Sequence, residues 1–269
     1  MTTNNFNIGF QNDIVIINVT VDNVEEVGIY CIKDKKSPGY KSKVEWFKNE
    51  INKGLRIKIA VDKQGKQLGF IEYISSELAW RPIKATNYFF IQCIALFDKE
   101  AKDMGIGSFL IQKCEQDAKD NKKSGICAMS SEGPWIANKS LFEKNKLTIA
   151  DNSDRFELMV KSFDNGTATP KFFDWTNEQA KYKGWNLMYS DQCPWHEKSI
   201  RDIQQSANDN GIKLKVKKLR TPKEAQEAPS GFGTFCLIKD GKLLADHCIS
   251  KTRFENIVRQ EMKNETINH

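Results

Sequence analysis

The pattern of apolar and polar residues divides the first part of the chain into short strands and helices. A β-branched run at residues 14 to 20 predicts a strand, and the almost unbroken apolar run at residues 88 to 97 predicts a central strand buried on both faces. Residues 55 to 61 and 67 to 75 alternate on either side of a turn, which predicts an antiparallel hairpin. Further strands are expected at residues 124–130, 147–150 and 156–163, and helices at residues 21–33, 40–53, 108–121 and 138–145.

The second part of the chain has its own order of elements. The pattern predicts strand, helix, strand, helix, hairpin and helix at residues 186–190, 194–208, 212–218, 222–227, 234–249 and 251–262. A polar stretch rich in turn residues precedes it, so we expect a first domain at residues 1–165, a linker at 166–184 and a smaller domain at 185–269. Breakers also occur inside the first domain, where Ser37, Pro38 and Gly39 are expected to separate the first two helices.

Composition narrows the class of protein without naming a function. The net charge is +6, shared evenly between residues 1–184 and 185–269, which does not indicate a nucleic-acid surface. The seven cysteines include no CxxC pair, so neither a disulfide framework nor a zinc ribbon is indicated. With no signal peptide pattern and no apolar run long enough to cross a membrane, we expect a soluble cytoplasmic protein with no membrane partner.

The loop after the central strand is the first candidate for chemistry. Gly105 and Gly107 lie between that strand and the helix that follows, where glycine allows a phosphate to approach the backbone closely. A helix that begins here offers unpaired N–H groups and the positive end of its dipole. Two glycines before a helix are also common as a simple turn or cap, and the third glycine of a dinucleotide-binding fingerprint is missing.

This stretch resembles motif A of the GNAT acetyltransferases, [Arg/Gln]-x-x-Gly-x-[Gly/Ala], with Lys102 at its first position. The segment that starts at Asn138 and contains Phe142 resembles a second motif of the family. The resemblance covers residues 14 to 163 and implies an α/β (α+β) acyltransferase fold that uses acetyl-CoA as co-substrate. The implied reaction is direct attack of an acceptor amine, on a small molecule or a peptide, on the acetyl carbonyl. The implied coenzyme-binding residues are Cys93, Ile94, Ala95, Leu96, Phe97, Lys102, Met104, Gly105, Ile106, Gly107, Ser108, Asn138 and Phe142.

The chain departs from the family where proton transfer is concerned. Phe142 occupies the position at which many relatives carry a tyrosine that protonates the leaving thiolate, and the glutamate that some relatives carry on the central strand is absent. Glu72, Tyr73 and Glu132 lie on or beside strands that are expected to border the acceptor cleft, so they are our candidates for the catalytic groups. Each of them could equally be an ordinary structural or surface residue. We assign no metal to this site.

The order of elements in the second part resembles a thioredoxin-like domain. Cys193 falls at the start of its first helix, where the helix dipole stabilises a thiolate, but His196 replaces the second cysteine of a CxxC motif. Joined to a GNAT domain, this segment resembles the C-terminal part of the YoaP-like acetyltransferases.

Three interpretations of Cys193 stay open. It could be a reactive thiol, or a ligand of a soft metal or metalloid with His196 and perhaps His247 or Cys248, or a structural residue before Pro194 at a helix start. The main functional prediction is therefore an N-acetyltransferase. The alternative is a protein that binds or senses thiols or soft metals through Cys193 and His196, with a vestigial GNAT domain.

Overall fold

The computed structural model describes residues 14–96, 101, 104–164 and 166–267, and the chain divides into two compact units. Unit 1 is drawn from Met1–Lys33, Lys48–Glu77 and Ala85–Lys171, and unit 2 from Asp34–Phe47, Leu78–Lys84 and Phe172–His269. Each unit is therefore assembled from segments that are separated in the sequence, whereas the sequence predicted consecutive domains with a linker at residues 166–184.

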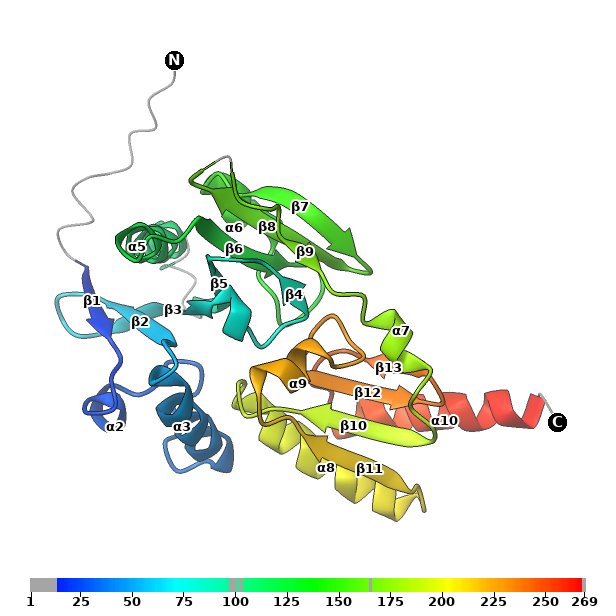
Figure 1. The fold of residues 1–269 in the computed structure, drawn as a ribbon. Coiled ribbons are helices and arrows are strands. Elements are labelled where there is room, and N and C mark those ends of the chain that lie inside the picture. The colour runs from blue at the N-terminus through cyan, green and yellow to red at the C-terminus, as the bar shows by residue number, and fades with distance from the viewer. Residues whose placement is uncertain (1–13, 97–100, 102–103, 165, 268–269) are drawn as a thin grey trace. The chain divides into compact units, whose positions relative to one another are not determined.

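Unit 1 is built on a seven-stranded sheet in the order β1-β2-β3-β5-β6-β8-β7 (Figure 1). Neighbouring strands run antiparallel except for β5 and β6, which are parallel. The apolar run that predicted a central strand forms β5, and the predicted hairpin forms β2 and β3. The strands are β1 (Val15–Asn18), β2 (Arg56–Val61), β3 (Gln67–Ser75), β5 (Tyr88–Ala95), β6 (Gly125–Ser130), β7 (Thr148–Ser153) and β8 (Phe156–Ser162).

Helix α5 (Ile106–Asp120) covers one face of this sheet, where it packs on β2, β3, β5 and β6 (Figure 1). Its buried side chains, among them Ile106, Leu110 and Ile111, join Tyr73, Phe89 and Ile91 of the sheet in one apolar core. The short helix α6 (Lys139–Lys144) contacts α5 and β8 and contributes Phe142 to the same core. The core therefore fixes the helix that follows the glycine loop against the middle of the sheet.

Two expectations for the N-terminal segment are wrong. The predicted helix at residues 21–33 shrinks to α2 (Val24–Val27), which ends at Gly28 with a φ of 80°. Pro38 and Gly39 do not separate two helices but are the first residues of α3 (Pro38–Ile51). Proline is favourable there because its fixed φ suits the first helical turn and its missing N–H has no intrahelical partner to lose.

Unit 2 contains a four-stranded sheet in the order β11-β10-β12-β13. Strands β10 (Trp185–Tyr189) and β11 (Leu214–Lys218) are parallel, whereas β12 (Phe235–Lys239) runs antiparallel to both β10 and β13 (Lys242–Ala245). The helices of this segment are α8 (Trp195–Asp209), α9 (Pro222–Gln226) and α10 (Lys251–Ile267), and α8 packs on α10. The predicted order of elements in this segment is confirmed. The remaining short elements are η1 (Ser76–Leu78), β4 (Ile83–Lys84), β9 (Lys171–Phe172) and α7 (Thr176–Gln179).

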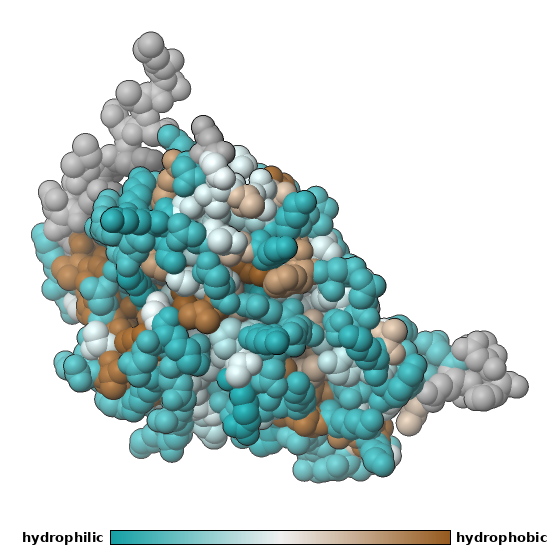
Figure 2. Space-filling view, in the orientation of Figure 1, coloured by the Kyte–Doolittle hydropathy of each residue, from teal (hydrophilic) through white to brown (hydrophobic). Residues whose placement is uncertain are grey.

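The surface is mainly hydrophilic on the face that Figure 2 shows, and hydrophobic residues there form small separate areas. In the part of the chain that the structure describes, none of the helices has the length and apolar character needed to span a bilayer. The mixed α/β class expected from the sequence is confirmed.

Candidate functional site

The segment that contains Gly105 connects β5, which ends at Ala95, to α5, which begins at Ile106. Gly105 is the residue before the helix and has a φ of 75°. This left-handed conformation disfavours any residue with a Cβ atom. The first helical N–H groups, from Ile106 to Ser108, have no intrahelical acceptor and lie at the positive end of a 15-residue helix. Such an end attracts an anion. Phe97 and Lys102, which the sequence predicted to contact the coenzyme, lie outside the described residues.

Strands β5 and β6 separate just before this loop. Their register extends only from Tyr88 opposite Gly125 to Ile91 opposite Ala128, whereas β5 continues beside β3 as far as Ala95. The register of β5 with β3 shifts between the pair Tyr73–Ile91 and the pair Glu72–Cys93, which places Gln92 at a bulge. Beyond the bulge, the four predicted coenzyme contacts Cys93, Ile94, Ala95 and Leu96 are all half-buried. The stretch of β5 that extends beyond its pairing with β6 thus precedes the anion-attracting end of α5.

The residues near the helix start are packed closely. A Cβ atom on Gly107 would lie 3.0 Å from a methyl carbon of Leu141 and 3.4 Å from one of Leu96, so this glycine allows α6 and β5 to approach α5. The buried hydroxyl of Ser108 accepts a hydrogen bond of 3.0 Å from the side-chain amide of Asn145. Gly107 and Ser108 therefore hold the start of α5 close to α6.

Asn138 and Phe142, two of the predicted coenzyme contacts, have structural roles at α6. Asn138 caps the helix, because its side-chain oxygen accepts a hydrogen bond of 3.0 Å from the N–H of Ser140. Phe142 is 1% exposed and belongs to the apolar core. Its ring therefore packs in the same core as the buried side chains of α5. The sequence could not show this structural role, because the family pattern places a polar tyrosine at the same position.

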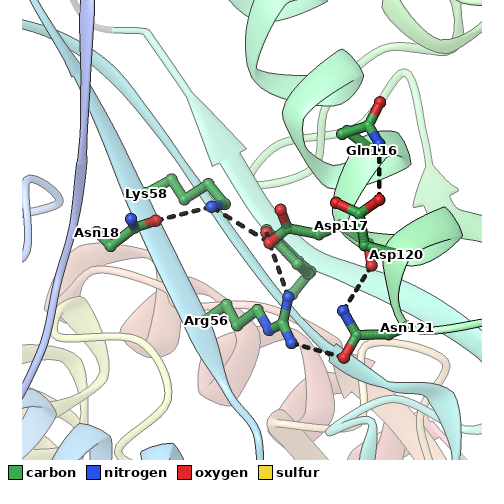
Figure 3. Close-up of polar contacts among 8 residues, drawn as sticks. Asn18, Arg56, Lys58, Gln116, Asp117, Asp120 and Asn121 are labelled. Carbon is green, nitrogen blue, oxygen red and sulfur yellow. Dashed lines mark hydrogen bonds and ion pairs between the residues drawn. The ribbon is translucent and has the colours of Figure 1, made fainter.

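A polar network attaches the far end of α5 to the sheet (Figure 3). The Asp117 carboxylate accepts hydrogen bonds from Arg56 at 2.8 Å and from the Tyr73 hydroxyl at 2.5 Å, and it lies 3.2 Å from the Lys58 ammonium. Burial acts to raise the pKa of Asp117, but the hydrogen bonds and the two positive charges outweigh it and lower the pKa. The carboxylate is therefore charged near neutral pH and ties α5 to β2 and β3.

The three catalytic candidates lie in different surroundings. The Tyr73 hydroxyl donates to Asp117, and burial is the main cause that raises the pKa of Tyr73 far above its usual value. These contacts favour a structural role for Tyr73. Glu132 is exposed on the loop after β6. Glu72 is fully buried in β3, in register with Cys93 beside the bulge of β5.

A second group of candidate site residues lies in unit 2. Cys193, His196 and Cys248 place their ligand atoms within 4.8 Å of one another, and in the described part of the chain no other His, Cys, Asp and Glu side chains form such a group of three or more. Cys193 precedes α8, His196 lies in its first turn, and Cys248 lies between β13 and α10. The sequence singled out Cys193 and His196, but it could offer Cys248 only as one of two possible neighbours, because the fold alone brings that residue close.

The imidazole of His196 is oriented by the backbone. Its Nδ1 atom lies 2.7 Å from the carbonyl oxygen of Ser190, and its Nε2 atom is buried with no hydrogen-bond partner among the residues that the structure describes. Burial lowers the pKa of His196 to about 4, the Ser190 carbonyl opposes this shift, and the positive charges of Arg81 and Lys43 add to it. His196 is therefore neutral at pH 7, with Nδ1–H donating to Ser190 and a lone pair on Nε2.

A hydrogen bond links the two thiols of the group. A hydrogen bond from Cys248 is the main cause that lowers the pKa of Cys193; burial acts against it, and the N–H of Trp195 and the charges of Lys43 and Arg81 assist. Burial, followed by this same hydrogen bond, raises the pKa of Cys248. Cys193 is thus the thiol of the pair that loses its proton first.

The loop that carries Cys248 is held against α8. The Ser199 hydroxyl donates a hydrogen bond of 2.8 Å to the carbonyl of Ile249 and accepts one of 3.2 Å from the N–H of the same residue. On the other side, a Cβ atom on Gly39 would lie 2.1 Å from the carbonyl oxygen of Pro194, so the start of α3 packs tightly on the Cys193 loop. These contacts therefore hold the backbone around Cys193 and Cys248 in place.

Comparison with known proteins adds to these observations. Residues 213–256 match the model of a family described as YoaP-like. The chain is 27% identical over 248 residues to the uncharacterized N-acetyltransferase YoaP of Bacillus subtilis (strain 168), and the match covers 90% of this chain and 97% of that protein.

Similar solved structures have lower identity. An acetyltransferase of the GNAT family from Staphylococcus aureus Mu50 is 15% identical with a TM-score of 0.42, covering 56% of this chain and 99% of that one. The GNAT family N-acetyltransferase YhbS from Escherichia coli, in complex with CoA, is 9% identical with a TM-score of 0.41, covering 60% of this chain and 91% of that one.

The similarity to YoaP confirms the resemblance to GNAT acetyltransferases that carry a YoaP-like C-terminal segment. The similarity to YoaP extends over residues of both units, and the region that matches the YoaP-like model runs from β11 into α10. The thioredoxin-like assignment of that region stays a prediction.

Proposed function

We propose that this protein is an acetyl-CoA-dependent N-acetyltransferase that transfers the acetyl group to the amine of a small molecule or peptide by direct attack. The observation that carries the proposal is the separation of β5 from β6 next to the N-terminus of α5. The similarity to an N-acetyltransferase over 90% of the chain supports it. Because that similarity includes the first unit as well as the YoaP-like region, the alternative of a vestigial GNAT domain is not favoured.

The parts of the coenzyme would be held by different elements. The pyrophosphate would accept hydrogen bonds from the N–H groups of the first turn of α5, beside Gly105. The pantetheine arm would lie beside residues 93 to 95 of β5 and Leu96, beyond the end of the β5–β6 pairing, where a backbone N–H could also stabilise the oxyanion of the tetrahedral intermediate. The chain's main contribution to the rate would be to hold the amine against the thioester.

Calorimetric titration of the full chain with acetyl-CoA tests this proposal. We expect saturable binding by the native chain and at least about fivefold weaker binding by Gly105→Glu, because a carboxylate within about 4 Å of the pyrophosphate would add repulsion of about 1 kcal/mol or more. Gly65→Glu is the matched control, since Gly65 also has a positive φ, of 80°, with open space at its Cβ position, but lies in the turn between β2 and β3.

The outcomes separate clearly. Binding by the native chain and by Gly65→Glu, together with turnover of an amine from a broad panel, would support the enzyme and its coenzyme loop. Absence of saturable binding by the native chain would overturn the proposed function, and unchanged affinity in Gly105→Glu would overturn the position of the pyrophosphate.

A further inference from the structure

The group formed by Cys193, His196 and Cys248 has the composition of a metal site. Two sulfurs and one imidazole nitrogen suit thiophilic ions such as Zn²⁺ and Cu⁺, whereas Mg²⁺ and Ca²⁺ prefer oxygen ligands. Zinc sites that accept an exogenous ligand use three protein ligands, and two cysteines with one histidine are one of the known sets. The acetyl transfer proposed above uses none of these three side chains, so the group needs another explanation.

The separations of the three ligand atoms agree with a single ion. Zinc–sulfur bonds of about 2.3 Å and zinc–nitrogen bonds of about 2.0–2.1 Å in a tetrahedral site place the ligand atoms about 3.5 to 3.8 Å apart. The upper limit of 4.8 Å in this structure exceeds those separations by about one ångström. Small side-chain rotations would close that difference.

The surroundings of His196 support a metal site independently of the distances between the three ligand atoms. Its Nε2 atom is buried and has no hydrogen-bond partner among the described residues, although a buried polar atom of this kind normally has one. Its Nδ1–H donates to the Ser190 carbonyl at 2.7 Å. A metal-binding histidine typically donates its other ring N–H in this way, which fixes the tautomer and directs the lone pair at the ion.

We propose that Cys193, His196 and Cys248 bind one thiophilic metal ion of the Zn²⁺ type, with the remaining coordination position open to a ligand from outside the group. A metal ion would bind the thiolate form of both cysteines and displace the thiol protons. The nearby charges of Lys43 and Arg81 favour an anion at the open position. The inference does not depend on the proposed acetyl transfer.

Titration of the reduced, metal-free full chain with Co²⁺, followed by displacement with Zn²⁺, tests the proposal. We expect one Co²⁺ per chain, a sulfur-to-cobalt charge-transfer absorption and displacement by Zn²⁺. Cys193→Ser, Cys248→Ser and His196→Gln should each weaken binding by more than about 100-fold, since loss of an outer-shell partner alone costs about 10–100-fold. His247→Gln and Cys236→Ala are the matched controls, because both residues lie in unit 2 outside the group, and they should bind as the native chain does.

A second measurement on the native chain guards against variants that fail to fold. Zn²⁺ should slow alkylation of Cys193 and Cys248 by iodoacetamide, measured by peptide mass spectrometry, and leave the rate at half-buried Cys31 unchanged. The proposal is overturned if the reduced native chain binds neither ion, or if binding persists in all three ligand variants. Formation of a Cys193–Cys248 disulfide by a chain that does not bind metal would also overturn it, in favour of a redox pair.

Discussion

At the scale of single residues, the sequence proposed three candidates for proton transfer and the structure distinguishes their surroundings. Glu72 is buried beside the bulge of β5, the Tyr73 hydroxyl is engaged by Asp117, and Glu132 is exposed. We therefore expect Glu72→Gln to lower kcat by about 100-fold or more, the range of a general base, while the affinity for acetyl-CoA stays unchanged. Steady-state kinetics with a saturating amine, together with calorimetry, would measure both quantities.

The other two candidates serve as controls for that experiment. Glu132→Gln should retain the native kcat, and Tyr73→Phe should lower the free energy of unfolding through the lost hydrogen bond to Asp117. A normal kcat in Glu72→Gln combined with a large loss in Glu132→Gln would contradict the assignment.

At the scale of elements, the attachment of α5 to β2 and β3 should depend on pH. The lowered pKa of Asp117 means that the carboxylate contributes stability that is complete above its pKa in the unfolded chain, about 3.9, and is lost as the pH falls through its pKa in the native chain. We expect Asp117→Asn to lower the free energy of unfolding by about 1.5–3 kcal/mol at pH 7, the range for hydrogen bonds to a charged group. Urea denaturation at pH 7 and below pH 3 would show the difference shrinking in acid.

Asp120 provides the control within the same helix. It accepts a hydrogen bond of 2.8 Å from Gln116 at the exposed surface, so Asp120→Asn should change the stability by less than about 0.5 kcal/mol at either pH (Figure 3). A difference between Asp117→Asn and the native chain that stays constant down to pH 2 would exclude the carboxylate charge as its source.

Most elements, but not all of their ends, could be predicted from the sequence. Period-two alternation located β2 and β3, and an apolar run located β5, because strand patterns are local. The bulge at Gln92 and the end of the β5–β6 pairing left no local signal, since both depend on how neighbouring strands fit together. The start of α3 was missed because proline and glycine are ambiguous between a turn and a first helical turn.

The candidate sites also differ in whether a local sequence pattern or the fold brings their residues together. A local motif identified the loop at Gly105 and the pair Cys193 and His196, whereas the place of Cys248 beside them depends on the loop between β13 and α10. The sequence also could not reveal that Asn138 caps α6, because the same side chain could cap a helix or contact a ligand.

At the scale of the whole molecule, the two units are not consecutive stretches of sequence. A fragment of residues 1–165 would retain residues 34–47 and 78–84 without the rest of unit 2. Trp46 and Trp80, which are 6% and 1% exposed in the full chain, belong to these segments. The two rings pack on each other with their centroids 5.5 Å apart, and we expect the rest of their apolar surface to become more exposed in the fragment.

We therefore expect this fragment to aggregate or to unfold at a lower temperature than the full chain. Size-exclusion chromatography and thermal unfolding would measure this, with binding of the dye ANS as a sign of exposed apolar surface. A monomeric fragment that does not bind ANS and unfolds at the temperature of the full chain would show that these segments need no partners.

The division of the chain into two interleaved units also has a consequence for folding during translation. Residues 34–47 leave the ribosome more than a hundred residues before residue 172, where the main part of unit 2 begins. At translation rates of about 5–20 residues per second, this segment waits roughly 6 to 25 s for its partners. During that time its apolar side chains are available to chaperones or to neighbouring nascent chains. The yield of native protein in a cell should therefore respond to how fast the middle of the message is translated.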